Sequence, residues 1–334
     1  MTGTTLRATL EEWELQRPFY ITGHRWDILA TLRVTVEREG CEGQGEAAGV
    51  YYRNDTPARM FQQIDALRTT IESGVSRLDL QQLLPSGGAR NALDCALWDL
   101  EAKLTGVPAW TTAGVDRPRP LLTTFTCGAA EPESMAATAV GYTGARAIKI
   151  KLTGEAIDIE RVRAVRAARR DVWLGVDANQ GFSLPFLKEV MPVLVEANVS
   201  LIEQPFPIGQ ERLLDDFRSP IPIAADESVQ CLEDISGAVG RFQVVNIKLD
   251  KCGGLTEGLL MARKARSLGL DVMVGNMMGT SLATAPAFLL GQLCDVVDLD
   301  GSIFLKGDRS EAVQFKDGHV TCPPSLWGTR KHED

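Results

Sequence analysis

The sequence has 334 residues, of which 44% are hydrophobic and 24% are charged, as in a globular protein with one large domain or a large domain and a smaller one. Acidic residues outnumber basic ones by 44 to 35, so we expect no nucleic-acid partner, because its phosphates would be repelled. No apolar run is long enough for a membrane helix, and the start, "MTGTTLRATLEEWELQ", lacks the apolar region of a secretory signal. Seven cysteines without a CxxC pair favour reduced thiols. We therefore expect a cytoplasmic protein with no membrane partner.

The first part of the chain, residues 1–112, predicts an α+β capping domain. Residues 28–37 alternate apolar and polar side chains, and together with residues 40–48 they predict an antiparallel sheet. Helices are expected at about 56–75 and 88–104. The proline and glycines of "GVPAWTTAG" (106–114) mark the junction with the next domain.

The second part, residues 113–304, alternates β-branched runs with amphipathic segments, which is typical of βα units around a parallel sheet. The predicted strands are 121–126, 147–151, 172–177, 200–203, 221–226, 244–248, 271–275 and 296–300. Clear helical patterns fill 157–170, 184–197 and 254–269. Eight strands and no helix after the last one predict a TIM-type (β/α)7β barrel. The C-terminal segment, about 305–334, predicts hairpin strands and turns that pack back on the capping domain.

Charged residues recur at the ends of the predicted barrel strands. These residues, each about one βα unit from the next, are Lys151, Asp177, Glu203, Asp226 and Lys248. In such a barrel the carboxyl ends of the strands converge on one mouth, where active sites lie. The lysines inside otherwise apolar strands are therefore expected at the rim of the barrel and not in its core.

The three acidic residues, Asp177, Glu203 and Asp226, supply hard oxygen ligands, with no histidine or cysteine among them, so Mg²⁺ is the expected cofactor. Lys151 and Lys248 flank them in chain order and should face each other across the cavity. Two such amines can take a proton from one face of a carbon and return one to the other. The metal would bind a substrate carboxylate and stabilise the enediolate formed by proton loss. A lysine base needs a lowered pKa, toward about 7 to 8, which nearby positive charge could provide.

These residues lie in motifs that resemble the muconate-lactonizing subgroup of the enolase superfamily. The motifs are "KIK" (149–151), "DANQ" (177–180), "EQP" (203–205), "ADES" (225–228) and "NIKLDKCGGL" (246–255), in the order and spacing of that subgroup. The resemblance covers nearly the whole chain and implies the lysines as the acid/base pair and the three carboxylates as magnesium ligands. The related mandelate-racemase subgroup needs a histidine in the barrel, which this sequence lacks.

The eighth strand adds "DLDG" (298–301), which resembles the Asp-x-Asp motif of dipeptide epimerases. The resemblance implies that Asp298 and Asp300 hold the α-ammonium group of a dipeptide, with Lys149 as a further charged residue of the substrate site. The implied reaction is a 1,1-proton transfer at the α-carbon of the C-terminal residue, with L-Ala-D/L-Glu as the best known substrate. Specificity would come partly from the cap loops 21–27 and 49–56.

Three further residues are predicted to contact substrate. Arg25, in the first cap loop, could bind an acidic side chain, and Asn276 and Met277, after strand seven, are expected in the pocket wall. Two other functions stay open at this point: a carboxylate lyase or cycloisomerase of the o-succinylbenzoate synthase or muconate cycloisomerase type, and a non-catalytic metal-binding homologue. A homo-oligomer is also left open.

Overall fold

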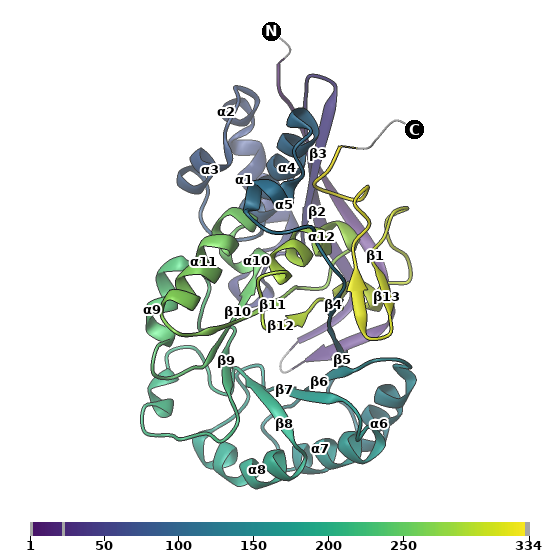
Figure 1. The fold of residues 1–334 in the computed structure, drawn as a ribbon, viewed down its shortest axis with the longest axis vertical. Coiled ribbons are helices and arrows are strands. Elements are labelled where there is room, and N and C mark those ends of the chain that lie inside the picture. Colours follow the sequence, from purple (N-terminus) through teal and green to yellow (C-terminus); the bar gives the residue numbers. More distant parts are fainter. Residues whose placement is uncertain (1–2, 22–23, 331–334) are drawn as a thin grey trace.

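The computed structural model describes residues 3–21 and 24–330. It contains a three-stranded antiparallel sheet with helices at one end and an eight-stranded parallel sheet at the other (Figure 1). Among the described residues, no helix is long and apolar enough to cross a membrane. The boundary between residues 112 and 113 stays a prediction.

The antiparallel sheet of the cap has the order β1 (Thr5–Ile21), β2 (His24–Arg38) and β3 (Cys41–Ala47). Leu32, Val34 and Val36 of β2 are buried, and they belong to one cluster with the apolar face of the cap helices. The sequence predicted β2 and β3 but not β1. Because β1 is an edge strand with mostly exposed side chains, it lacks the apolar alternation that marked its neighbour.

The cap helices are α1 (Pro57–Ala66), α2 (Arg68–Glu72), α3 (Arg77–Leu83) and α4 (Gly88–Thr105), preceded by the short helix η1 (Tyr51–Arg53). Thr56 begins α1 by accepting a hydrogen bond from the Arg59 amide, and Gly106, with φ 71°, ends α4. The predicted helix at 56–75 is divided at Leu67 into α1 and α2. The predicted helix at 88–104 is confirmed as α4, most of which is buried.

The barrel strands are all parallel and neighbour one another in chain order. They are β5 (Thr124–Cys127), β6 (Ala147–Lys151), β7 (Trp173–Asp177), β8 (Val199–Glu203), β9 (Ile223–Ala225), β10 (Val244–Lys248), β11 (Asp271–Gly275) and β12 (Val296–Asp298). Side chains bridge the seam between β12 and β5, where the Thr124 hydroxyl donates to Asp298 and the Leu299 amide donates to Thr123. The predicted (β/α)7β barrel is confirmed.

Helices cover the outside of the barrel, as Figure 1 shows for α6, α7, α8 and α11. Their bounds are α5 (Ala109–Ala113), α6 (Pro132–Gly141), α7 (Ile157–Ala168), α8 (Leu184–Glu196), α9 (Ile235–Ala238), α10 (Leu249–Cys252), α11 (Leu255–Ser267) and α12 (Ser281–Gly291). Short helices η2 (Glu211–Leu214) and η3 (Leu232–Asp234) lie in the connections. The three helical patterns noted in the sequence are confirmed as α7, α8 and α11.

The C-terminal segment contacts both the cap and the start of the barrel. After η4 (Gly301–Phe304), the hairpin of β13 (Gln314–Lys316) and β14 (His319–Thr321) pairs with β4 (Leu121–Leu122). The predicted strand 121–126 is thus two strands, since β4 leaves the barrel to join this hairpin. On the cap side, Arg309 forms ion pairs with Glu11 and Glu46, and the Trp327 indole donates to the Gln44 carbonyl.

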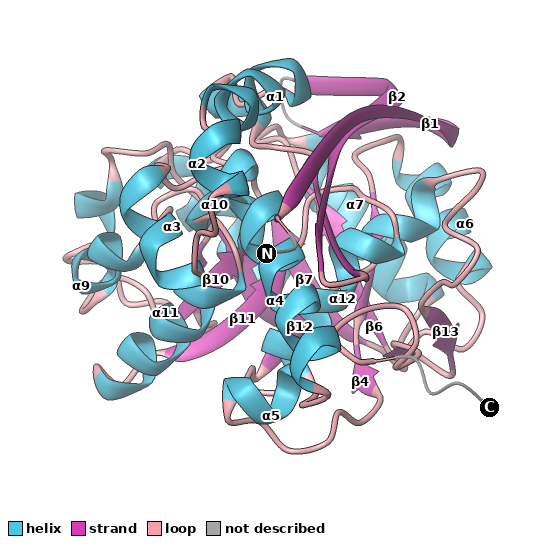
Figure 2. Cartoon of the chain, turned by 90° about the horizontal axis from the view of Figure 1, so that it is seen from above, coloured by secondary structure: helices cyan, strands magenta, loops and turns pink. Residues whose placement is uncertain are grey.

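The β1–β2 ribbon places the cap over the barrel mouth. Seen from above, this ribbon curves out to one side of the helices of the cap (Figure 2), and in Figure 1 the end of β1 and the start of β2, here called its tip, reach the strands of the barrel. At that tip, the Phe19 ring packs against Phe304 of η4 with 4.6 Å between ring centroids. The tip of the ribbon therefore forms part of the wall of the barrel mouth.

Candidate active site

The charged strand ends meet at one mouth of the barrel. Lys151 is level with Asp177 in the pairing of β6 with β7, and Asp177 is level with Glu203 in the pairing of β7 with β8. Lys248 ends β10, and Asp226 directly follows β9. All five side chains are buried. A cavity of about 440 Å³, which is in the size range of small-molecule sites, opens over this mouth.

Each of the buried carboxylates contacts a lysine. The Lys151 ammonium lies 2.5 Å from Asp177 Oδ2, and the Lys248 ammonium lies 2.6 Å from Asp226 Oδ2. Lys149 donates to Glu203 Oε2 at 3.0 Å. Burying any of these charges alone would be costly, so the pairs explain how lysines are tolerated inside apolar strands.

The two predicted acid/base lysines lie on opposite sides of the cavity. Lys151 is on β6 and Lys248 is on β10, four strands away in the ring of eight, and both side chains line the same cavity. A carbon atom held between them would have one amine on each face. This arrangement can remove a proton from one face and deliver one to the other.

The pKa values of the three carboxylates differ because their neighbours differ. Burial alone would raise the pKa of Asp177, but Lys151 and then Lys149 lower it below its usual value. Burial likewise opposes the lowering of the pKa of Asp226, which Lys248 and Lys251 hold well below its usual range. Burial and the nearby Asp177 raise the pKa of Glu203 to about 7. Asp177 and Asp226 are thus anionic over the whole physiological pH range.

Lys248 differs from the expectation that the pKa of a lysine base is lowered. Burial lowers the pKa of Lys248, but Asp226 and Glu203 outweigh burial and raise it well above its usual value. Lys149 behaves in the same way, because Asp298 and Glu203 stabilise its charge. The nearby carboxylates therefore affect the pKa values of these two lysines more than the neighbouring ammonium groups do.

The donor set of this mouth fits a hard cation. Three buried carboxylates from successive strands offer oxygen alone, and the nearby Asn179 Oδ1 and Glu227 Oε2 are buried without a hydrogen-bond partner. Among the described residues, however, the oxygens of these three carboxylates do not all lie within 4.8 Å of one another. Asp177, Glu203 and Asp226 are the residues that would hold such an ion.

The Asp-x-Asp pair lies at the seam of the barrel and lines the same cavity. Asp298 accepts from Lys149 and from the Thr124 hydroxyl, and Asp300 accepts from the Thr126 amide. Burial opposes the lowering of the pKa of Asp298, which Lys149 outweighs, whereas burial and the charge of Asp298 raise the pKa of Asp300 to about 7. Asp300 is therefore the carboxylate of the pair that has no cation paired with it among the described residues.

The three other predicted substrate contacts do not share one position. Asn276 and Met277 line the cavity, in the segment that follows β11. Arg25 is not among the lining residues, because its exposed guanidinium forms an ion pair with Asp27 at 2.5 Å and lies over the Tyr20 ring. The structure thus brings Asn276 and Met277 to the site and directs Arg25 away from it.

Both predicted cap loops, 21–27 and 49–56, contribute to the wall of the cavity, but the sequence did not single out their side chains Trp26, Tyr51 and Tyr52. Phe19 and the buried acid Glu227, which also line the cavity, were not predicted. Alternation along β2 could have placed Trp26 on the same face as His24, and the two consecutive acids of "ADES" could have drawn attention to Glu227. No local signal shows that the tip of a cap hairpin reaches the barrel.

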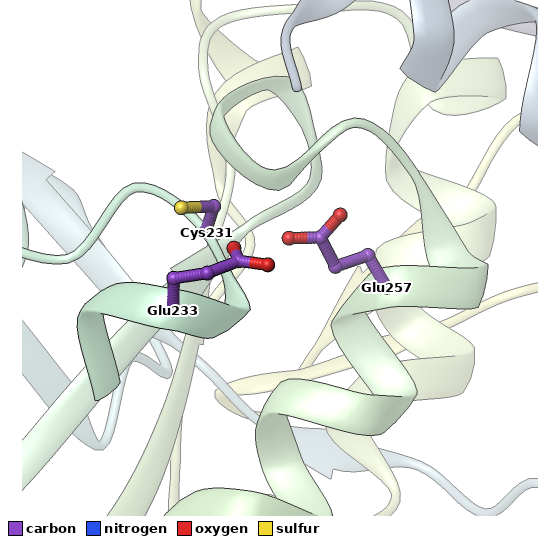
Figure 3. Close-up of side chains that lie close together, drawn as sticks. All are labelled: Cys231, Glu233 and Glu257. Carbon is purple, nitrogen blue, oxygen red and sulfur yellow. The ribbon is translucent and has the colours of Figure 1, made fainter. Parts of the chain in front are cut away.

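A second group of candidate metal ligands lies outside this mouth. Cys231, Glu233 and Glu257 have ligand atoms within 4.8 Å of one another, and Figure 3 shows the two carboxylates directed toward each other. Glu257 is already paired with the buried Arg90 and accepts from the Leu232 amide. Its charge is therefore compensated within the chain, and we assign no metal here.

Together, the barrel, the buried carboxylates and the opposed lysines define a class of enzyme that moves protons at a carbon next to a metal-bound carboxylate. The comparisons with known families agree. Residues 3–114 match the N-terminal domain of the mandelate racemase / muconate lactonizing enzyme family, and residues 133–326 match the enolase C-terminal domain-like family. The chain therefore belongs to the mandelate racemase / muconate lactonizing enzyme family of the enolase superfamily.

Three relatives are particularly similar. The L-Ala-D/L-Glu epimerase of Escherichia coli is 36% identical, over 95% of this chain and 99% of that protein. An enolase family member of Agrobacterium tumefaciens with homology to dipeptide epimerases, solved with sodium and L-Ala-L-Glu, is 38% identical with a TM-score of 0.94, covering 97% of this chain and 100% of the other. The dipeptide epimerase of Methylococcus capsulatus, solved with Mg and L-Arg-D-Lys, is 29% identical with a TM-score of 0.91, covering 98% and 99%.

Proposed function

We propose that this protein is a magnesium-dependent dipeptide epimerase in which Lys151 and Lys248 exchange the α-proton of the C-terminal residue. The observation that carries the proposal is the position of the two lysines, four strands apart in the ring and lining one cavity with the Asp-x-Asp pair. Its relatives of known structure include a dipeptide epimerase solved with Mg and a dipeptide, which supports the same substrate class.

The metal would be held by Asp177, Glu203 and Asp226. When bound, Mg²⁺ supplies positive charge that stabilises the negative charge gained by the substrate carboxylate, a contribution of roughly several kcal/mol. The protein contributes the position of the α-carbon between the two lysines. Asp177 and Asp226, which contact Lys151 and Lys248, would share their negative charge with the ion, so they would stabilise the two ammonium groups less and favour the neutral, basic form of the lysines.

The Asp-x-Asp pair would bind the other end of the dipeptide. Asp300 is buried and lacks a paired cation among the described residues, so a substrate ammonium group would compensate its charge. Asp298 is already held by Lys149 and adds negative charge beside it. A substrate with an ammonium group at one end and a carboxylate at the other is thereby oriented across the mouth.

The direct test is solvent exchange at the α-carbon. In deuterium oxide with Mg²⁺, an L,L-dipeptide should gain one deuterium at its C-terminal α-carbon and form the L,D epimer, both visible by NMR. A chelator should stop the exchange. The lack of exchange with every dipeptide of a broad library would rule the proposal out.

Asp300→Asn separates this reaction from lyase or cycloisomerase chemistry. A dipeptide epimerase should lose at least about tenfold in kcat/KM, because the variant no longer pairs with the ammonium group. An enzyme whose substrate lacks an ammonium group should keep its activity in the same variant. A non-catalytic protein would bind Mg²⁺ but show no exchange with or without the substitution.

A further inference from the structure

Six aromatic rings form a continuous wall on one side of the cavity, here called the aromatic arc. Its members, all lining the cavity, are Phe304, Phe19, Trp26, His24, Tyr51 and Tyr52. Neighbouring rings are in contact: centroid distances are 4.6 Å for Phe19–Phe304, 4.1 Å for His24–Trp26 and 5.1 Å for Tyr51–Tyr52. Trp26 connects the two halves, at 6.1 Å from Phe19 and 5.2 Å from Tyr51.

The arc runs from the ammonium end of the site to the metal end. Phe304 lies in the short helix directly after Asp300. At the other end, the Gln230 amide donates both to the Tyr52 hydroxyl at 3.0 Å and to the Glu227 carbonyl at 2.6 Å, which places Tyr52 beside the segment of the metal ligand Asp226. A dipeptide bound between these two ends would lie along the arc.

The cap side of the cavity offers no lysine or arginine to a ligand. Among the described residues that line it, the cap contributes one carboxylate, Asp55, which accepts from the Gly88 amide, and one imidazole, His24, whose ring packs against Trp26 and Tyr51. Two arginines nearby are engaged elsewhere. Arg25 pairs with Asp27, and Arg53 donates to Gln230 and to the Lys251 and Ser86 carbonyls. An acidic side chain directed at the cap would therefore lose its hydration without gaining the permanent charge of a lysine or arginine.

We propose that the aromatic arc receives the side chain of the epimerised residue and selects dipeptides in which that side chain is large and uncharged, either aromatic or branched aliphatic. This inference rests on the proposed function. With the substrate carboxylate at the metal and the α-carbon between the lysines, the side chain must leave the barrel mouth toward the cap, where the rings offer an apolar surface.

The test compares three dipeptides as mixed substrates: L-Ala-L-Phe, L-Ala-L-Leu and L-Ala-L-Glu. We expect kcat/KM for the first two to exceed that for L-Ala-L-Glu at least tenfold, since a hydrophobic pocket rejects a charged group more strongly than it rejects a change of size. A preference for L-Ala-L-Glu, or equal rates, would overturn the inference. If none of the three exchanges its α-proton, the proposed function itself has failed.

Substitutions in the arc locate the effect. Trp26→Ala and Tyr51→Ala should each lower the ratio of kcat/KM for L-Ala-L-Phe to that for L-Ala-L-Ala by about tenfold. This ratio does not depend on the fraction of folded enzyme, so a destabilised variant still gives an answer. Tyr20→Ala is the matched control, because Tyr20 is next to Phe19 on the same strand but is exposed and contacts Arg25. Its ratio should not change, and an unchanged ratio in the two arc variants would contradict the proposal.

Discussion

At the scale of single residues, the site depends on the compensation of buried charge. Lys149 is only 3% exposed and contacts both Glu203 and Asp298, so one ammonium group links the proposed metal ligands to the proposed ammonium site. Lys251 is fully buried and pairs with Asp226. These two lysines compensate the negative charge of carboxylates on the floor of the site. Lys151 and Lys248 flank the site and are the lysines expected to move protons.

Replacing the flanking lysines one at a time should separate the two faces of the α-carbon. We predict that Lys151→Met slows proton exchange with one epimer by at least about 10²-fold and that Lys248→Met does the same with the other epimer. In each variant one face of the α-carbon would lack its acid/base group. Deuterium incorporation into the pure L,L and L,D dipeptides, followed by NMR, measures this. If either variant lost both exchanges equally while still binding Mg²⁺, the two-base arrangement would be wrong.

The pKa of Asp300 predicts how activity depends on pH. Burial and Asp298 raise it to about 7, and only the ionised carboxylate attracts an ammonium group. We therefore expect kcat/KM to rise with pH up to about 7 and then to level off. The profile should be measured at saturating Mg²⁺, since Glu203 also has a raised pKa of about 7. In Asp300→Asn the rising limb should disappear; a variant that keeps it assigns that limb to another group.

At the scale of elements, the sequence predicted the barrel because its strands carry their own signal. The segments 147–151, 244–248 and 271–275 are apolar, β-branched runs, and they match β6, β10 and β11 residue for residue. β4 could not be separated from β5 in the sequence, because the difference lies in the strand that each one pairs with. Pairing with a distant hairpin leaves no mark in the local pattern.

The entry to α11 depends on a glycine in a crowded position. Gly254 has φ 119°, and a Cβ there would lie 2.5 Å from the Cβ of Asp94, which accepts from the Thr256 amide and hydroxyl at the helix start. We predict that Gly254→Ala destabilises the protein by more than ~3 kcal/mol, combining backbone strain with steric overlap.

A second glycine serves as the control for that experiment. Gly269 has φ 76°, but a Cβ there would meet nothing within 4 Å. Gly269→Ala should therefore cost only the backbone strain, about 1 kcal/mol or slightly more. Urea denaturation of both variants measures the difference. Equal losses would mean that crowding against Asp94 contributes nothing.

At the scale of the whole molecule, the site is built from two parts that the sequence could not bring together. The barrel half was predicted correctly in position, because strand ends converge by topology alone. For the cap half the sequence named the loops 21–27 and 49–56 but not the side chains that enter the cavity, since the direction of Arg25, Trp26 and Tyr51 depends on how the β1–β2 ribbon twists and where it meets the barrel. Arg25 and Trp26 are neighbours on one strand, so their side chains point to opposite faces, and only Trp26 lines the cavity.

One of the contacts that join the cap to the barrel should make stability depend on pH. Asp250 of α10 is buried and accepts from the Ala48 and Gly49 amides of the cap, and burial raises its pKa to about 7 from 3.8. The folded state therefore binds a proton that the unfolded state releases, so this contribution to stability is complete below pH 3.8 and is lost as pH rises through 7. Asn can accept the same hydrogen bonds without charge, so between pH 5 and 8 Asp250→Asn should gain about 3 kcal/mol relative to the wild type. Urea denaturation at fixed Mg²⁺ measures this gain.

Asp171→Asn is the control, because Arg169 lowers the pKa of the exposed Asp171 to about 2 and its ionisation is complete by pH 5. The prediction fails if the stability of Asp250→Asn changes with pH as that of the wild type does. The Asp250 carboxyl group of the wild type would then already be ionised in the folded protein at pH 5, and the junction would tolerate a buried charge.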